Sequence, residues 1–119
     1  MSSHQSGNKK LNMRSPHRTS VLRNQIISFI INGKLKTTKA RVKVVQQMVE
    51  KLVTVARRGN DFNTIRRIAK EIPYKKEAVD KLIKEIAPRY VERPGGYTRV
   101  YPMGRRLSDT AVIARLEWV

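Results

Sequence analysis

The chain has 119 residues, no cysteine, and 26 Lys and Arg against 9 Asp and Glu, which gives a formal net charge of +17. This length fits a single domain, and the lack of cysteine excludes disulfides and cysteine-ligated zinc and fits a reducing compartment. Because like charges repel one another in a compact monomer, an excess of this size indicates a polyanionic partner, against which Lys and Arg release condensed counterions.

The basic residues are concentrated before the first acid, which is Glu50. The Lys and Arg that precede it are Lys9, Lys10, Arg14, Arg18, Arg23, Lys34, Lys36, Lys39, Arg41 and Lys43. The longest apolar run, 26–31, is interrupted by Ser28 and is too short to cross a bilayer. No apolar stretch follows the N-terminal charges, as it would in a secretory signal. We therefore expect an intracellular protein without a membrane partner.

Residues 1–14 are polar and basic and include Gly and Ser. Such a segment buries too little apolar surface to fold alone, but it can order on a charged surface. We expect an extended basic tail over residues 1–14, with its charge on Lys9, Lys10 and Arg14, followed by one domain over residues 15–119.

The first predicted helix has Ser15 as its N-cap and Pro16 in its first helical position, and it ends at Gly33. Its apolar stripe comprises Leu22, Ile26, Phe29 and Ile30. The other face is basic and polar, with His17 close by, and comprises Arg14, Arg18, Arg23, Asn24 and Gln25.

A short β-leaning segment, 34–38, comes next, and Thr38 is placed to cap a second helix that Gly59 and Asn60 end. The apolar positions of this helix recur at spacings of three and four: Val42, Val45, Met48, Val49, Leu52, Val53 and Ala56. Its cations mostly fall on other faces and are Lys39, Arg41, Lys43 and Lys51. A solvated surface would explain such cations, but charge of one sign favours a phosphate partner.

Two further helices are predicted. Asp61 or Asn63 caps the third, which carries Phe62, Ile65, Ile68, Ala69 and Ile72 and is broken by Pro73. The fourth covers 75–87 and stops before Pro88, with Val79, Leu82, Ile83 and Ile86 facing inward. Its outer face has opposite charges at spacing four (Glu77/Lys81, Asp80/Lys84 and Lys81/Glu85), which indicates a solvated surface with ion pairs.

The pattern changes to strands after Pro88. Residues 97–101 and 111–119 alternate, and the second segment has Val112, Ala114, Leu116 and Trp118 on one face and Ile113, Arg115 and Glu117 on the other. Turn-forming residues at 102–104 and 108–109 lie in the connection between these two segments. The order predicts an α+β fold: a block of four helices and a small antiparallel sheet made of the C-terminal hairpin and the short early strand near Leu35.

Catalysis is not indicated. The histidines are His4 and His17, and no spacing places His17 with Ser108 and Asp109 as a hydrolytic triad would require. We expect no enzyme activity, no cofactor and no metal.

Gly95 and Gly96 follow Arg93-Pro94 in a turn-rich loop, but they lack the preceding strand and following helix of a P-loop. Two interpretations stay open. The glycines form a tight turn that tolerates positive φ, or they also let the backbone approach phosphate, flanked by Arg89, Arg93 and Arg99.

Tyr90, Tyr97 and Tyr101 lie among these arginines, and such interleaving is typical of surfaces that stack bases. Tyrosines of strands usually pack on a core instead, so we expect packing for two of the three. Trp118, at the end of an alternating strand, is expected in the core.

DNA-binding proteins usually show a recognition helix, a zinc module or a basic zipper, and none is evident here. A membrane-binding helix needs a large exposed apolar face, whereas these stripes match one another as core. A basic tail joined to a small core with a basic face favours binding to structured RNA. A DNA-binding architectural protein is the alternative.

The run PRYVERPGGYTRV, 88–100, resembles the signature of bacterial-type ribosomal protein seventeen of the large subunit. Further matches follow in the family's order: Lys10-Leu11-Asn12, His17-Arg18 with Arg23-Asn24, Lys36-Thr37-Thr38 with Lys39-Ala40, Gly104 with Arg106, and the terminal Leu116-Glu117. The resemblance covers essentially the whole chain.

The resemblance implies an α+β structural constituent of the large ribosomal subunit, with a tail that enters RNA, near the mouth of the nascent-chain exit tunnel. Its partners would be large-subunit ribosomal RNA and neighbouring large-subunit proteins, with no small-molecule substrate, in a cytoplasmic or organellar ribosome. Family tails open with Arg and His after Met1, whereas this chain has Ser2, Ser3, His4 and Gln5. We expect RNA contacts at Lys9, Lys10, Arg14, His17, Arg18, Arg23, Asn24, Lys36, Thr37, Lys39, Arg41, Lys43, Arg89, Arg93, Gly95, Gly96, Tyr97 and Arg99.

Overall fold

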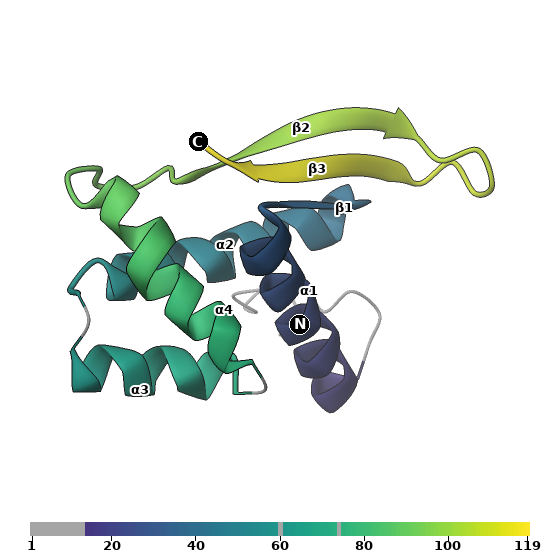
Figure 1. Ribbon diagram of the computed structural model, residues 1–119. Helices are drawn as coiled ribbons and strands as arrows, with labels where there is room; N and C mark the ends of the chain where they lie inside the picture. Colours follow the sequence, from purple (N-terminus) through teal and green to yellow (C-terminus); the bar gives the residue numbers. More distant parts are fainter. Residues whose placement is uncertain (1–13, 60, 74) are drawn as a thin grey trace, which may run out of the picture.

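A three-stranded sheet lies along one side of a group of helices, and its hairpin turn extends beyond them at one end (Figure 1). The computed structural model describes residues 14–59, 61–73 and 75–119, so the predicted tail, apart from Arg14, lies outside the described residues. The elements in chain order are α1 (Ser15–Asn32), β1 (Lys34–Thr38), α2 (Lys39–Ala56), α3 (Phe62–Glu71), α4 (Lys76–Lys81), the π-helical segment η2 (Leu82–Ile86), the 3-10 segment η3 (Ala87–Tyr90), β2 (Thr98–Arg105) and β3 (Val112–Trp118). This arrangement confirms the predicted α+β fold.

The sheet has the order β1-β3-β2, and both pairs of strands are antiparallel. The predicted early strand therefore joins the hairpin along β3. Leu116 of the central strand lies opposite Leu35 of β1 and Val100 of β2. Ala114 and Leu116 are buried against the helices, which confirms the inward face expected for β3 except at its start, where Val112 is exposed.

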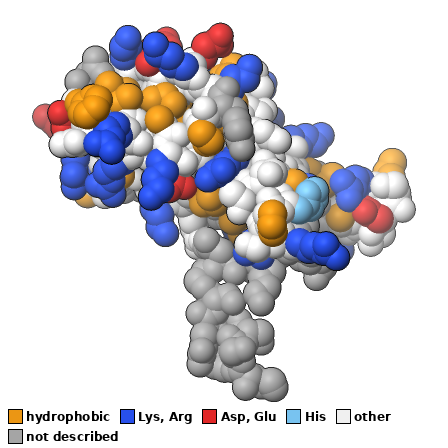
Figure 2. Space-filling model, turned by 90° about the horizontal axis from the view of Figure 1, so that it is seen from below, with side chains coloured by type: hydrophobic (Ala, Val, Ile, Leu, Met, Phe, Trp, Pro, Cys, Tyr) orange, Lys and Arg blue, Asp and Glu red, His pale blue; other side chains and the backbone are white. Residues whose placement is uncertain are grey.

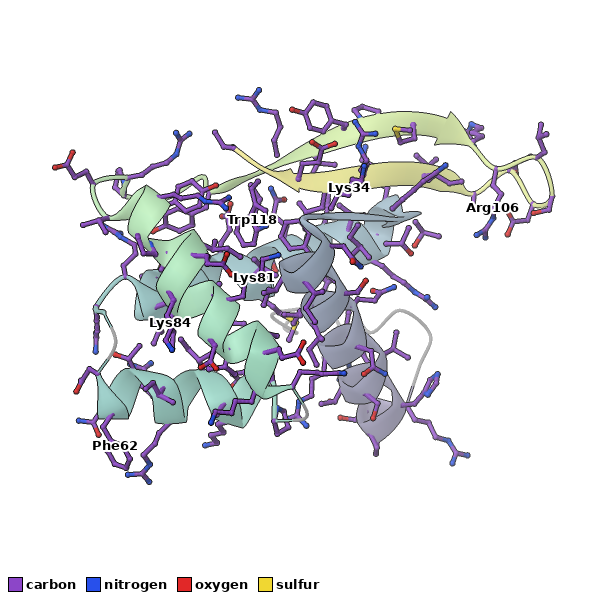
Figure 3. The ribbon with its side chains drawn as sticks, viewed as in Figure 1. Lys34, Phe62, Lys81, Lys84, Arg106 and Trp118 are labelled. Carbon is purple, nitrogen blue, oxygen red and sulfur yellow. The ribbon has the colours of Figure 1, made fainter. Side chains whose placement is uncertain are left out.

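α2 is the central helix of the core. It packs against α1, α3, all three strands and the η2–η3 segment. The apolar stripe predicted for it is buried apart from Met48, which is half-buried. Trp118 lies between the sheet and the helices (Figure 3), with its ring centroid 4.5 Å from that of Phe29, as expected for a core residue.

The starts of α1 and α2 and the end of α1 lie within one residue of the prediction. α2 ends at Ala56, earlier than the predicted stop at Gly59 and Asn60, of which Asn60 lies outside the described residues. Gly33 ends α1 in a left-handed conformation, with φ of 84°. The N-cap of α1 is Arg14, one residue before the predicted Ser15, and Pro16 falls within the first two helical positions. Thr38 is the N-cap of α2 as predicted, but its side chain makes no capping hydrogen bond.

The buried stripe of α3 differs from the prediction. Asp61 is its N-cap. Phe62 and Ile65, expected on the apolar stripe, are exposed, Phe62 by 70%. Ile68 and Ile72 are buried as predicted and Ala69 is half-buried, but Thr64, four residues before Ile68, takes the inward position expected for Ile65.

The fourth helix was predicted to stop before Pro88, and this prediction is wrong. The helical path continues through η2 into η3, where Pro88 occupies one of the first two positions. Proline lacks the N–H that an uninterrupted α-helix would use here, and it lies where the geometry changes from π to 3-10. The inward residues of this segment are buried as expected.

The ion pairs predicted on the fourth helix do not form. Lys81 Nζ instead donates a hydrogen bond to the carbonyl oxygen of Ile31 at 2.7 Å. The widening from α to π geometry at Leu82 also changes which residues lie above one another, so the spacing of four no longer aligns Asp80 with Lys84.

The hairpin connection is shorter than predicted. Pro102 and Gly104 belong to β2, whose pairing with β3 shifts register between Pro102 and Arg105. β2 is an edge strand, where proline removes no ladder hydrogen bond facing a neighbour. The turn itself is closed by a hydrogen bond of 2.8 Å from the backbone N–H of Arg106 to the carbonyl of Ala111.

Candidate nucleic-acid interface

Three of the residues expected to contact RNA lie together in the first turn of α1 or just before it. Arg14 and His17 are exposed, and Arg18 is half-buried. The N-cap makes no side-chain hydrogen bond and the first turn holds no acid, so the positive end of the helix dipole is not neutralised locally. Further along α1, Arg23 is half-buried and Asn24 is exposed.

A second group of predicted residues follows at the junction of β1 and α2. Lys36 is exposed on the edge strand β1, beside the half-buried Thr37. In the first turns of α2, Lys39 and Lys43 are exposed and Arg41 is half-buried. This helix also begins without an acid in its first turn and without a side-chain cap. Helix N-termini of this kind, next to Lys and Arg, favour phosphate oxygens.

Acids do not neutralise these cations within the part of the chain that the structure describes. The ion pairs found there join Arg106 to Asp109 and Arg115 to Glu117, both in the C-terminal hairpin. The first acid of the chain, Glu50, accepts hydrogen bonds from Thr98. The positive charge of α1, β1 and the start of α2 is therefore available to an external anion.

The loop between η3 and β2 is fastened to α2 by Arg57, which sequence reasoning did not single out. Its Nη1 donates to the Tyr97 hydroxyl at 3.0 Å, and its Nη2 donates to the carbonyl of Val91 at 2.7 Å. No pattern in the sequence marks Arg57 for this role, because the contact spans 40 residues. Arg57 fixes the loop that carries the glycine turn.

The glycine turn has the conformation expected of it. Gly96 has φ of 63°, and Arg93 Nε donates to the carbonyl of Gly95 at 3.1 Å. Arg89, Arg93 and Arg99 are all exposed around this turn. The turn role of the glycines is thus confirmed, and their contact with phosphate remains a prediction.

Two of the three predicted tyrosines pack in the core, as expected. Tyr90 is buried and its hydroxyl donates to the carbonyl of Val119 at 2.8 Å, and burial raises the pKa of Tyr90. Tyr97 is 1% exposed. Its ring therefore has no open face on which a base could stack. The expected RNA contact of Tyr97 stays a prediction, while its hydroxyl accepts the hydrogen bond of Arg57 that holds the loop. Tyr101 is half-buried.

The outward face of the sheet adds cations that were not among the predicted site residues. Lys34 is exposed on β1 (Figure 3), and Arg115 lies on β3 opposite Lys36. The alternation of residues 112–118 predicts that Arg115 lies on the face of the strand opposite Trp118. The sequence does not predict that β1 pairs with β3, and this pairing brings Lys34 and Lys36 beside Arg115.

The side of the molecule away from the sheet carries both apolar and basic side chains (Figure 2). Figure 2 shows hydrophobic side chains gathered on part of this face, with Lys and Arg around them. A cavity of about 330 Å³ lies between α1, α2 and α3, lined by Ile26, Met48, Lys51, Leu52, Val55, Arg67 and Glu71. The exposed Phe62 has the guanidinium carbon of Arg66 5.6 Å from its ring centroid.

The residues considered for catalysis are not brought together. His17 lies in the first turn of α1, at the end of that helix away from the sheet, whereas Ser108 and Asp109 lie in the turn between β2 and β3 (Figure 1). Asp109 is engaged by Arg106. Over residues 14–59, 61–73 and 75–119, no group of three His, Asp or Glu is arranged to hold a metal ion.

Among the described helices, none has the length and apolar character needed to span a membrane.

Comparisons with known proteins give a consistent result. The family described as ribosomal protein L17 matches residues 21–119. The large ribosomal subunit protein bL17 of Clostridium novyi is 45% identical over 111 residues, which are 93% of this chain and 96% of that protein. The bL17 protein of Akkermansia muciniphila is 44% identical over 108 residues, 91% of this chain and 78% of its own. That of Gemmatimonas aurantiaca is 41% identical over 116 residues, 98% of this chain and 97% of its own.

Proposed function

The chain belongs to the ribosomal protein L17 family, and from this premise we propose that it binds and stabilises folded ribosomal RNA, mainly through backbone phosphates. The family resemblance expected from the sequence is confirmed. The protein is accordingly a structural constituent of the large ribosomal subunit, a ribonucleoprotein component of the translation machinery.

The observation that carries the RNA proposal is the run of cations through α1, β1 and α2 with no acid before Glu50. The described part of this run forms no ion pair within the protein. Each phosphate that a Lys or Arg neutralises releases counterions, so such a surface gains affinity for RNA that it would not gain from a neutral partner.

The residues expected to contact RNA form two groups at different places on the protein. Arg and Lys of α1, β1 and α2 would meet phosphate oxygens, with His17, Asn24 and Thr37 adding hydrogen bonds. The exposed Arg89, Arg93 and Arg99 around the glycine turn would form a second phosphate contact. Phosphate contacts position a protein on RNA without reading its sequence, which suits a structural component. Lys9 and Lys10, outside the described residues, would extend the first contact.

We further propose where the protein lies and what it contacts. The protein would lie near the exit of the nascent-chain tunnel, against large-subunit ribosomal RNA and neighbouring large-subunit proteins, in the ribosomes of the bacterial cytoplasm. The family is structural and carries no known enzymatic role, and it favours RNA over the architectural DNA-binding alternative.

Crosslinking in cells followed by sequencing of the attached RNA tests the proposal. We expect the crosslinks to fall on large-subunit ribosomal RNA and the protein to sediment with the large subunit. A duplex DNA competitor should displace the folded ribosomal RNA poorly. Crosslinks spread over messenger RNA, or preferential binding to the DNA, would contradict the proposal.

A further inference from the structure

The outward face of the sheet carries two rows of residues fixed by the strand register. Lys36, Arg115 and Tyr101 are opposite one another in the first row, because both outer strands pair with β3 at Arg115. Lys34, Glu117 and Arg99 form the second row in the same way. The neighbouring residues of β3, Ala114 and Leu116, are buried against the helices. Side chains alternate along a strand, so both rows face away from the core.

Most of the positive charge of these two rows is not neutralised by an acid among the described residues. Glu117 is the acid within them, and it forms an ion pair with Arg115. Lys34, Lys36 and Arg99 are exposed and take part in no ion pair among the described residues. The rows thus combine a cationic excess with a single aromatic ring.

Tyr101 is held in place without being buried. The guanidinium carbon of Arg115 lies 5.5 Å from the centroid of its ring, within the range of a cation–π contact. The ring is half-buried, in contrast to Tyr90 and Tyr97, which are enclosed by the core. Its hydroxyl makes no hydrogen bond to another described residue, so the ring is not required to complete the fold's polar network.

A shallow hollow of about 630 Å³ adjoins the first row. Its lining residues are Asn32, Lys34, Lys36, Met103 and Arg115. Three of these five are cations, and none is an acid. Arg115 is paired with Glu117, but Lys34 and Lys36 take part in no ion pair among the described residues, so the hollow keeps two free cations that suit a phosphate group.

We propose that this outward face is a second RNA site, which takes an unpaired nucleotide by stacking its base on Tyr101 and holding its phosphate in the hollow. The inference rests on the proposed RNA-binding function and adds a class of ligand to it. A base in a duplex is covered on both faces by its neighbours, whereas an unpaired base can stack on an aromatic ring. The phosphate surface of α1 and α2 has no exposed tyrosine and gives no such preference.

The test compares a single-stranded uridine decamer with a 16-base-pair RNA duplex as probes for the full-length protein. Removing the ring with Tyr101→Leu, which keeps the apolar bulk, should weaken binding of the decamer about 5- to 100-fold. Binding of the duplex, which depends on phosphates, should change less than twofold. Tyr101→Phe keeps the ring and should bind both probes like the wild type.

Phe62→Ala is the matched control, because Phe62 is also an aromatic residue beside an arginine, and it is exposed, but it lies on α3. It should leave both affinities unchanged. Lys36→Gln should weaken binding of the decamer, and Lys84→Gln, on the η2 segment, should not. A decamer that carries 4-thiouridine should crosslink to a β2 peptide.

The inference is overturned if a folded Tyr101→Leu protein binds the decamer within twofold of the wild type, or if Phe62→Ala lowers binding equally. It is also overturned if the wild type binds ribosomal RNA but not the decamer. Failure of the proposed function looks different, because the wild type would then not bind ribosomal RNA at all.

Discussion

Glu50 Oε2 accepts two hydrogen bonds from Thr98, one from its hydroxyl at 2.9 Å and one from its backbone N–H at 3.2 Å. The first acid of the chain is therefore used inside the protein, where it joins the middle of α2 to the start of β2. It does not neutralise the basic residues that precede it.

Replacing Glu50 with Ala should lower the free energy of unfolding by about 1–3 kcal/mol, since two donors of Thr98 then lose their charged acceptor in a partly buried place. Urea unfolding measures the change. Glu85→Ala is the control, because Glu85 is exposed on η2 and forms no ion pair among the described residues. Equal effects of the two variants would contradict this role for Glu50.

Removing the Tyr97 hydroxyl should destabilise the loop that carries the glycine turn. In Tyr97→Phe, Nη1 of Arg57 loses its acceptor, which should cost about 1 kcal/mol of unfolding free energy. Hydrogen exchange at residues 91–97 should also become faster. Tyr101→Phe, which removes a hydroxyl without a hydrogen-bond partner in the described chain, should leave both measurements unchanged, and a similar loss there would refute the assignment.

Trp118 closes the core between the sheet and α1, with its ring stacked on Phe29. Trp118→Ala should lower the unfolding free energy by about 3 kcal/mol, at the lower end for large aromatic residues because Trp118 is half-buried. Circular dichroism during thermal unfolding measures the loss. Leu107→Ala, at a fully exposed apolar residue, should cost almost nothing. A loss as small for Trp118 as for Leu107 would place Trp118 outside the core.

The hairpin turn should respond to acid through Asp109. The hydrogen bond and charge of Arg106 hold the pKa of Asp109 at about 2, below its usual 3.8. Because the folded pKa is the lower one, the stabilising contribution is complete above about pH 4 and is lost as the pH falls through about 2. A carboxyl-carbon NMR titration should give a midpoint near 2, and Arg106→Gln should raise it. A wild-type midpoint near 3.8 would show that the pair does not form in solution.

The helices could be predicted because their causes are local. Proline and glycine positions set the ends of α1, and the spacing of valines fixed the buried face of α2. Local pattern failed at α3, where Thr64 is buried and Phe62 is exposed. Which apolar residues are covered depends on the packing of α3 against α2 and α4, and periodicity alone does not contain that information.

For the candidate site, the sequence predicted the basic residues but not the contacts between distant segments. The position of cations in the chain marked α1, β1 and α2, and most of these side chains are exposed. The burial of Tyr97 and the role of Arg57 depend on contacts between distant residues, such as the hydrogen bond between these two, which are 40 residues apart. The row that joins Lys36, Arg115 and Tyr101 depends on a sheet register that unites three distant segments.

The most direct test of the central claim is the salt dependence of binding to large-subunit ribosomal RNA by the wild type and two double variants. Lys39→Gln with Lys43→Gln removes two exposed cations of α2, and Lys76→Gln with Lys84→Gln removes two exposed cations from the fourth helical segment. We expect a steep fall of affinity with salt for the wild type, a slope of log affinity against log salt reduced by about 2 in the first variant, and no change in the second. Affinity that is insensitive to salt, or equal slopes for the two variants, would contradict binding through phosphates at α1, β1 and α2.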